Sequence, residues 1–142
     1  MAAKQVPPSA FIPFRREKTG HIIVMASLSS KPARLLVDTG AGGTCIHAGL
    51  LKKYQLSLTA KTEKGGGGGS SSMKLITIES HDLSLQGVDL SPFKLIALDL
   101  SHVIAGLAKA KVEGIAGVLG ADILHRRHAV IDYARGGILL SQ

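Results

Sequence analysis

The stretch LLVDTG, residues 35–40, places an aspartate, a threonine and a glycine directly after three apolar residues. Leu35, Leu36 and Val37 predict the end of a buried strand, so we expect the carboxylate of Asp38 at a buried strand end. Burying a carboxylate is costly unless hydrogen-bond donors surround it, and burial shifts its pKa. A catalytic acid or base needs such a shift, although an Asp-Thr-Gly sequence also forms ordinary turns.

The apolar residues around this stretch predict several short strands. His21 to Leu28 and Ala33 to Val37 are separated by Ser29-Ser30-Lys31-Pro32, which is a hairpin signal. Alternating or continuous apolar residues predict further strands at 73–78, 83–85, 88–90 and 96–100. Ile46, Leu50 and Tyr54 are four residues apart, which predicts a short helix over 46–54.

The last part of the chain alternates between strand and helix signals. Gly114 to Leu119 is a small-residue apolar run that ends at Gly120. Ala121 to His128 is predicted as a short helix, because its acidic residue lies near the start and its basic residues near the end. A closing hairpin is predicted from residues 129–133 and 137–140. Many short strands with two short helices indicate a mostly β domain.

Composition restricts the class of protein. The chain has 142 residues, of which 45% are hydrophobic and 19% charged, so we expect one folded domain. Its net charge of +7 is scattered in pairs such as Arg15-Arg16, Lys52-Lys53 and Arg126-Arg127, and no nucleic-acid site is predicted. No stretch approaches the roughly 18 apolar residues of a membrane helix, and residues 1–10 lack the apolar block of a signal peptide. The compartment stays undecided.

Other candidate groups have simpler structural roles. Cys45, the single cysteine, neighbours His47, but a small cysteine beside an apolar residue is more simply a core residue. His125 and His128 are one helical turn apart without an evident third ligand, so no metal site is predicted. Turn, surface or cap positions are predicted for Asp82, Asp99, Asp122 and Asp132.

The segment GGGGGSSS, residues 65–72, has the most flexible composition in the chain. By composition alone it is an engineered linker or the flexible tip of a long hairpin. It is no phosphate-binding loop, because it lacks the Gly-Lys-Ser/Thr ending and the spaced glycines of a dinucleotide fingerprint.

Three segments together resemble the retropepsin-like aspartic proteases, the single-domain relatives of retroviral proteases. Asp38-Thr39-Gly40-Ala41 matches their active-site tetrad, and Ile115-Ala116-Gly117-Val118-Leu119-Gly120 is similar to their second signature. With Ile131-Asp132-Tyr133, the pattern is similar to bacterial members in particular. The likeness spans about residues 20 to 140.

The resemblance implies a closed, barrel-like β domain with one or two short helices and a flap hairpin. Residues 1–19 are expected to form an extended N-terminal arm and residues 20–142 the protease domain. The flap is expected at about residues 60–78, which makes the glycine run its tip. That run comprises Gly65, Gly66, Gly67, Gly68 and Gly69.

The resemblance also implies an aspartic endopeptidase that acts as a homodimer on peptides or proteins. The Asp38 carboxylates of two chains would share one proton, with no metal or other cofactor. Thr39 would hydrogen-bond across the interface, Gly40 would let the backbone approach the carboxylate, and Val118, Leu119 and Gly120 would form the second signature. Ala41 lacks the hydroxyl of a serine, so we expect an activity optimum nearer weak acidity.

Two departures from the retroviral pattern leave an alternative open. Retroviral enzymes interleave their N- and C-terminal strands, whereas this chain stops two residues after Leu140 and begins with a proline-bearing segment. The flap run also lacks the apolar residue that usually flanks its glycines. The alternative is a catalytically silent retropepsin-like binding or regulatory module.

Overall fold

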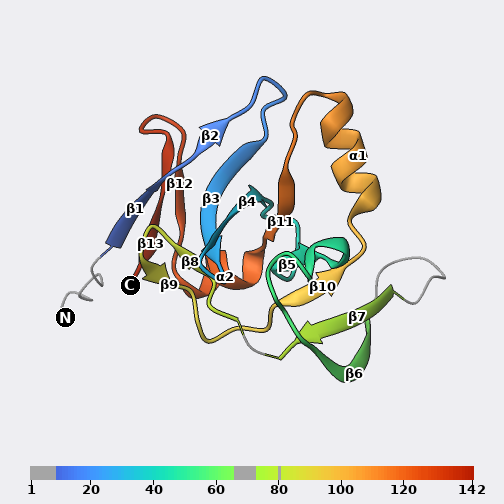
Figure 1. Ribbon diagram of the computed structural model, residues 1–142. Helices are drawn as coiled ribbons and strands as arrows, with labels where there is room; N and C mark the ends of the chain where they lie inside the picture. The colour runs from blue at the N-terminus through green and yellow to red at the C-terminus, as the bar shows by residue number, and fades with distance from the viewer. Residues whose placement is uncertain (1–8, 66–72, 80) are drawn as a thin grey trace.

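In the computed structural model, which describes residues 9–65, 73–79 and 81–142, the strands form two sheets (Figure 1). The smaller has the order β1-β13-β12, with β1 at Ser9–Pro13, β12 at Val130–Asp132 and β13 at Gly137–Ser141. The larger is curled into a half-barrel, in the order β6-β7-β10-β5-β11-β4-β3-β8-β9, with β2 paired to β3. Its strands are β2 (Arg15–Arg16), β3 (Ile22–Leu28), β4 (Lys31–Val37), β5 (Cys45–His47), β6 (Leu58–Gly65), β7 (Met73–Ile78), β8 (Ser84–Leu85), β9 (Val88–Asp89), β10 (Ile96–Leu98) and β11 (Ile115–Leu119).

The predicted hairpin before the LLVDTG stretch is confirmed. β3 and β4 pair antiparallel, with Ile23 opposite Leu36 and Leu28 opposite Lys31. The turn between them places Ser29 and Ser30 at positive φ. Most apolar residues of the two strands are buried, and the last of them, Val37, directly precedes Asp38.

β11 lies at the centre of the larger sheet, and all five of its residues are buried. It runs parallel to β4, with Leu119 beside Val37, and antiparallel to β5, with Val118 opposite Cys45. A Cβ on Gly117 would overlap the carbonyl oxygen of Cys45, so this close approach requires glycine. The small residues in the apolar run 114–119 therefore allow β4, β11 and β5 to pack closely beneath the Asp38 loop.

The helices differ in part from the prediction. α2 (Ala121–Arg126) is the helix expected after Gly120, whereas α1 (Ser101–Lys109) was not predicted. The helix predicted over 46–54 is wrong, because β5 pairs on both sides with β10 and β11 and only a 3₁₀ turn, Ala48–Leu50, follows. Strand hydrogen bonds on both sides outweigh the weak helical spacing of the apolar residues.

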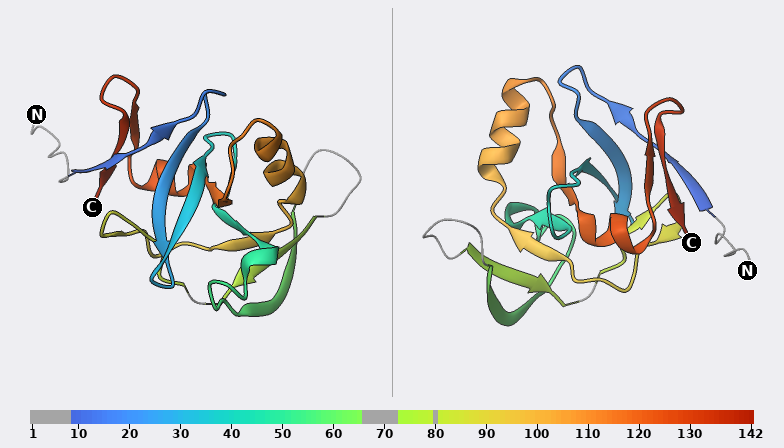
Figure 2. Two further views of the ribbon diagram at one scale, coloured as in Figure 1. Left: turned by 45° about the horizontal axis from the view of Figure 1, so that its top comes forward. Right: turned by 180° about the vertical axis from the view of Figure 1, so that it is seen from behind.

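Two apolar clusters cover opposite faces of the larger sheet. Leu35 belongs to the first cluster and Leu36 to the second, because successive strand residues face opposite sides. Leu107 of α1 packs in the second cluster. In Figures 1 and 2, α1 lies on the far side of β3, β4 and β11 from the smaller sheet.

The N-terminal strand β1 pairs antiparallel with the C-terminal strand β13, from Ser9 opposite Ser141 to Pro13 opposite Gly137. Of the arm expected over 1–19, residues 9–13 thus form part of the smaller sheet, and residues 1–8 lie outside the described residues. The boundary between arm and domain stays a prediction. None of the helices in the described part of the chain has the length and apolar character to cross a membrane.

Candidate active site

Asp38 is the first residue after β4, and its loop is held by backbone hydrogen bonds. Its N–H donates to the carbonyl oxygen of Leu119 at 3.0 Å, and its own carbonyl oxygen accepts from the N–H of Ala41 at 3.2 Å. Its carboxylate oxygen Oδ1 accepts from the N–H of Gly40 at 2.9 Å. The loop therefore presents the carboxylate at a defined position beside the end of β11.

The expected burial of Asp38 is wrong for the single chain. Val37 is the last buried residue of β4, and Asp38, Thr39 and Gly40 are all exposed. The reason is that the loop leaves the sheet where β4 ends. The apolar side chains before Asp38 are buried in the core, whereas the carboxylate lies beyond the edge of that core. In one chain, water reaches the Asp38 side chain.

Asp38 lies between two hollows of similar size. One, of about 370 Å³, is lined by Asp38, Thr39, His21, Ile131 and Tyr133 among others. The other, of about 360 Å³, is mostly apolar, and its walls include Leu36, Ala41, Ile96, Leu98, Val103 and Val118. Asp38 is the only carboxylate among the described residues that line the second hollow.

Thr44 joins the Asp38 loop to the start of α2. Its fully buried hydroxyl accepts from the N–H of Gly120 at 3.0 Å and donates to Oδ1 of Asp122 at 2.8 Å. The N–H of Ala121 donates to the carbonyl oxygen of Ala41 at 2.7 Å. Sequence reasoning missed Thr44; the available signal was a polar residue directly before the apolar pair Cys45-Ile46.

The second signature lies against the first. A Cβ on Gly120 would come within 2.7 Å of the Gly43 carbonyl carbon and oxygen, so the strand-to-helix junction requires glycine. Leu119 is fully buried and Val118 lines the apolar hollow. A Cβ on Gly40 would lie 3.3 Å from Oδ1 of Asp38, a tight contact. The fold thus brings together the two signatures, whose roles stay predictions.

The expected flap falls partly outside the described residues. Gly65 is the last residue of β6, whereas Gly66, Gly67, Gly68 and Gly69 lie outside them. β6 and β7 pair antiparallel, and Gly65 is opposite Met73. β7 also pairs with β10, which connects this hairpin to the sheet that carries the Asp38 loop.

Cys45 is a core residue, as predicted, and it is not activated for nucleophilic attack. Burial raises the pKa of its thiol to about 11, although a hydrogen bond from the backbone of Val118 partly opposes the shift. His47 uses Nδ1 to accept the N–H of Leu100 at 3.0 Å. Among the described residues, no three His, Cys, Asp or Glu side chains are grouped to hold a metal ion.

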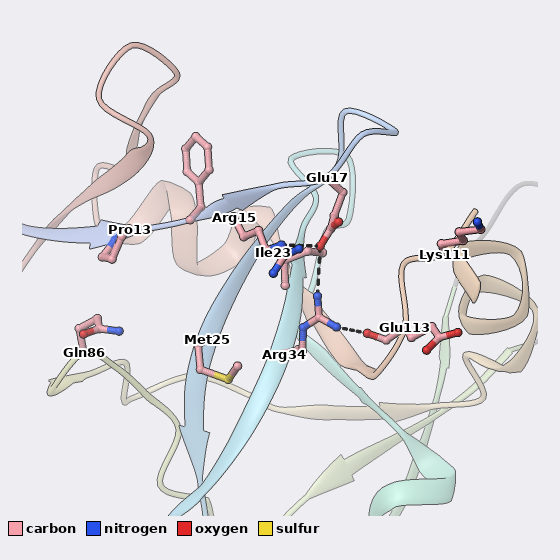
Figure 3. A pocket seen from close by; sticks show the side chains of 10 residues that line it. Pro13, Arg15, Glu17, Ile23, Met25, Arg34, Gln86, Lys111 and Glu113 are labelled. Atoms are coloured by element: carbon pink, nitrogen blue, oxygen red, sulfur yellow. Dashed lines mark hydrogen bonds and ion pairs between the residues drawn. The ribbon is translucent and has the colours of Figure 1, made fainter. Parts of the chain in front are cut away.

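A third hollow, of about 560 Å³, is larger but does not include Asp38 (Figure 3). Glu17 lies between Arg15 and Arg34, at 3.3 Å and 3.2 Å from their guanidinium nitrogens. Arg34 also donates to the carbonyl oxygen of Glu113. Because these charges bind each other within the hollow, they form a structural ion-pair network, and we assign no chemistry to them.

Comparison with known proteins agrees with this geometry. The profile of a family described as aspartyl protease matches residues 24–123, whereas no curated protein matches the chain. A retropepsin-like aspartic protease from Rickettsia conorii is similar in structure, with 18% identity, a TM-score of 0.59, and coverage of 98% of this chain and 96% of that one.

Two further solved structures share the fold. The EIAV protease, solved in complex with the inhibitor HBY-793, has 15% identity and a TM-score of 0.55, covering 79% of this chain and 92% of its own. The retroviral protease-like domain of Ddi1 from Leishmania major has 15% identity and a TM-score of 0.57, covering 84% of this chain and 87% of its own. At these identities, the likeness concerns the fold alone.

Proposed function

This chain belongs to the aspartyl protease family and has a retropepsin-like fold, and we propose that it is an aspartic endopeptidase that acts as a homodimer. The observation that carries the proposal is the position of Asp38. Its carboxylate is exposed on a loop that is hydrogen-bonded to the end of β11, between two hollows. One chain supplies one such carboxylate, and peptide hydrolysis by this route needs two.

A two-fold dimer supplies the second Asp38 across its axis. Two carboxylates about 3 Å apart cannot both ionise, so the pair holds one shared proton. The ionised carboxylate takes a proton from a water molecule as the water attacks the peptide carbonyl, and the protonated one donates to the carbonyl oxygen. The chemistry proceeds without a metal or a covalent intermediate.

The supporting residues have separate tasks in this proposal. Gly40 donates its N–H to the Asp38 carboxylate and leaves space beside it. Thr39, exposed next to Asp38, hydrogen-bonds to the partner chain. Val118 forms part of the substrate cleft, while Gly120 allows α2 to begin directly behind the Asp38 loop.

The dimer forms through the β12 edge of the smaller sheet. β12 is an outer strand in the order β1-β13-β12, and an outer strand offers unpaired N–H and C=O groups to a second chain. Val130 and Tyr133 are 53% and 64% exposed there, although both have large apolar surfaces. Ile131 and Tyr133 line a hollow with Asp38 and Thr39, so a second copy on this edge comes next to the Asp38 loop.

Substrate binds as an extended peptide along the cleft, beneath a flap. β6 and β7 are the arms of this flap, and Gly65 stands at the end of the first arm. Gly66 to Gly69, which belong to the proposed tip, lie outside the described residues. The extended backbone of the peptide places successive side chains on alternate sides of the cleft.

Cleavage of a diverse peptide library by the purified protein tests the proposal. We expect cleavage that a pepstatin-like inhibitor blocks and that Asp38→Asn abolishes, because asparagine keeps the shape of the side chain but cannot carry the shared proton. Cleavage that survives Asp38→Asn would assign the activity to another group. Peptide binding without any cleavage by the folded wild-type dimer would instead support the silent binding module.

A further inference from the structure

The apolar hollow beside Asp38 has one wall that comes from α1. The other lining residues lie on or next to β4, β5, β10 and β11, the strands around the Asp38 loop. Val103, in the first turns of α1, lines the hollow as well. Asp38 directly follows β4, whereas Val103 belongs to α1. The hollow between them therefore has one wall from the sheet and another from the helix.

The exposure of Val103 is unusual for its position on the helix. It is 43% exposed, whereas Leu107, one turn later on the same face, is buried in the second apolar cluster. The apolar face of α1 therefore extends from Leu107 in the core to Val103 at the hollow, where the Val103 side chain is partly exposed to solvent. An apolar side chain at this point gains contacts only when another apolar group enters the hollow.

A hydrogen bond attaches the start of α1 to β5, and local hydrogen bonds cap both ends of the helix. The N–H of Leu100 donates to Nδ1 of His47, the last residue of β5, at 3.0 Å. Asp99 accepts from the hydroxyl and the N–H of Ser101, and these bonds lower the pKa of its carboxyl. At the other end, the N–H of Val112 donates to the carbonyl oxygen of Leu107 at 2.9 Å. Val103 thus has a defined place relative to the strands that carry Asp38.

We propose that Val103 is a specificity-determining residue that limits the size of the apolar substrate side chain held next to the scissile bond. The inference rests on the proposed function, in which Asp38 directs water at that bond. A side chain beside the bond then enters the apolar hollow and meets Val103 on its far wall. A larger residue at 103 shortens the space, and a smaller one lengthens it.

The test compares Val103→Phe and Val103→Ala with wild type on peptides that differ in one side chain next to the cleaved bond, from Ala through Leu to Phe. One methylene in an apolar pocket changes kcat/KM by about 10-fold or more. We expect Val103→Phe to lower kcat/KM for the Phe peptide relative to the Ala peptide by at least about 10-fold. Val103→Ala should shift the preference in the opposite direction.

The matched control is Met25→Phe, since Met25 is 47% exposed and lines a hollow that does not include Asp38. Thermal melts establish that all variants are folded. An equal change for every peptide in Val103→Phe, or the same shift in Met25→Phe, would overturn the inference while leaving the peptidase intact.

A binding measurement separates this inference from the proposed function. Fluorescent versions of the same peptides are titrated onto Asp38→Asn, with and without Val103→Phe. If wild type cleaves nothing but Val103→Phe changes the size preference of binding, the Val103 pocket stands and the peptidase proposal fails. If no peptide is cleaved and none is bound, both proposals fail.

Discussion

The N–H of Asp38 donates to the carbonyl oxygen of Leu119 at 3.0 Å, which joins the loop after β4 to the end of the parallel strand β11. Two segments that are far apart in the sequence therefore determine one another's position. The Thr44 hydroxyl adds a second connection, from the same loop to the N–H of Gly120. A substitution in the segment around Leu119 and Gly120 is therefore expected to shift the Asp38 carboxylate, even where the substituted side chain does not contact it.

Replacing Thr44 by valine removes both hydrogen bonds of its hydroxyl while nearly preserving its shape. The N–H of Gly120 and the carboxylate of Asp122 then lose a buried partner. We expect the free energy of unfolding to fall by about 1–3 kcal/mol, measured by urea denaturation. Thr44→Ser, which keeps the hydroxyl, is the control and should lose less. A valine variant as stable as wild type would show that the Thr44 hydrogen bonds contribute nothing.

Placing a charge on the β12 edge should prevent association. In the proposed dimer, a lysine at Val130 would have to be desolvated between two copies of the strand. We expect wild type to sediment as a dimer and Val130→Lys as a monomer at the same concentrations, and the variant to lose peptide cleavage in parallel. Met25→Lys, at a similarly exposed apolar residue, should leave both properties unchanged. A dimeric, active Val130→Lys protein would place the interface elsewhere.

The buried thiol of Cys45 should resist alkylation. Burial raises its pKa from 9.0 to about 11, so at pH 8 the thiolate is about 100-fold rarer in the folded than in the unfolded chain. Iodoacetamide should therefore label Cys45 at least about 100-fold more slowly in buffer than in urea. A rate in buffer that equals the rate in urea would mean that the β5–β11 pair opens readily.

The same shift has a defined effect on stability. The folded state holds the Cys45 proton more tightly than the unfolded state does. The resulting contribution to the free energy of unfolding is fully present below the unfolded pKa of 9.0 and is lost as the pH rises toward about 11. Cys45→Ala removes this titration, so its unfolding free energy should depend less on pH between 9 and 11. Parallel curves for the two proteins would contradict the assignment to Cys45.

Strands could be predicted wherever apolar residues alternate or form short uninterrupted runs. β3, β4 and β7 were predicted on this basis, and so was the closing hairpin, whereas β11 was seen only as a small-residue apolar run. The helix α1 was missed because Gly106 interrupts its centre and its apolar residues repeat over little more than one turn. Its formation depends instead on packing of Leu107 into a cluster made by distant strands.

The candidate site was predictable only in part. The tetrad at 38–41 and the second signature at 118–120 carry recognisable residues, and the structure brings them together. The role of Thr44 was not predictable, because its partners Gly120 and Asp122 come next to it only after the fold forms. The apolar run before Asp38 wrongly suggested a buried carboxylate, since sequence alone does not show where the loop leaves the sheet.

Adding a hydroxyl next to the carboxylate should change the pH dependence of cleavage. A serine at Ala41 can donate a hydrogen bond to Asp38, which favours the ionised form and lowers the pKa of the pair. We expect the acidic limb of the kcat/KM profile of Ala41→Ser to move toward lower pH. Ala41→Cys adds an atom of similar position but a weak donor, so its profile should move less. An unmoved profile for Ala41→Ser would refute this account of Ala41.

Subunit mixing tests most directly whether two chains contribute one Asp38 each. Wild type and Asp38→Asn are unfolded together, refolded in varied proportions at constant total concentration, and assayed on a cleaved peptide, with native mass spectrometry to confirm random pairing. If both carboxylates are needed, activity follows the square of the wild-type fraction and falls to about one quarter in an equal mixture. Activity that falls in simple proportion, to about one half, would mean that each chain cleaves with its own carboxylate alone.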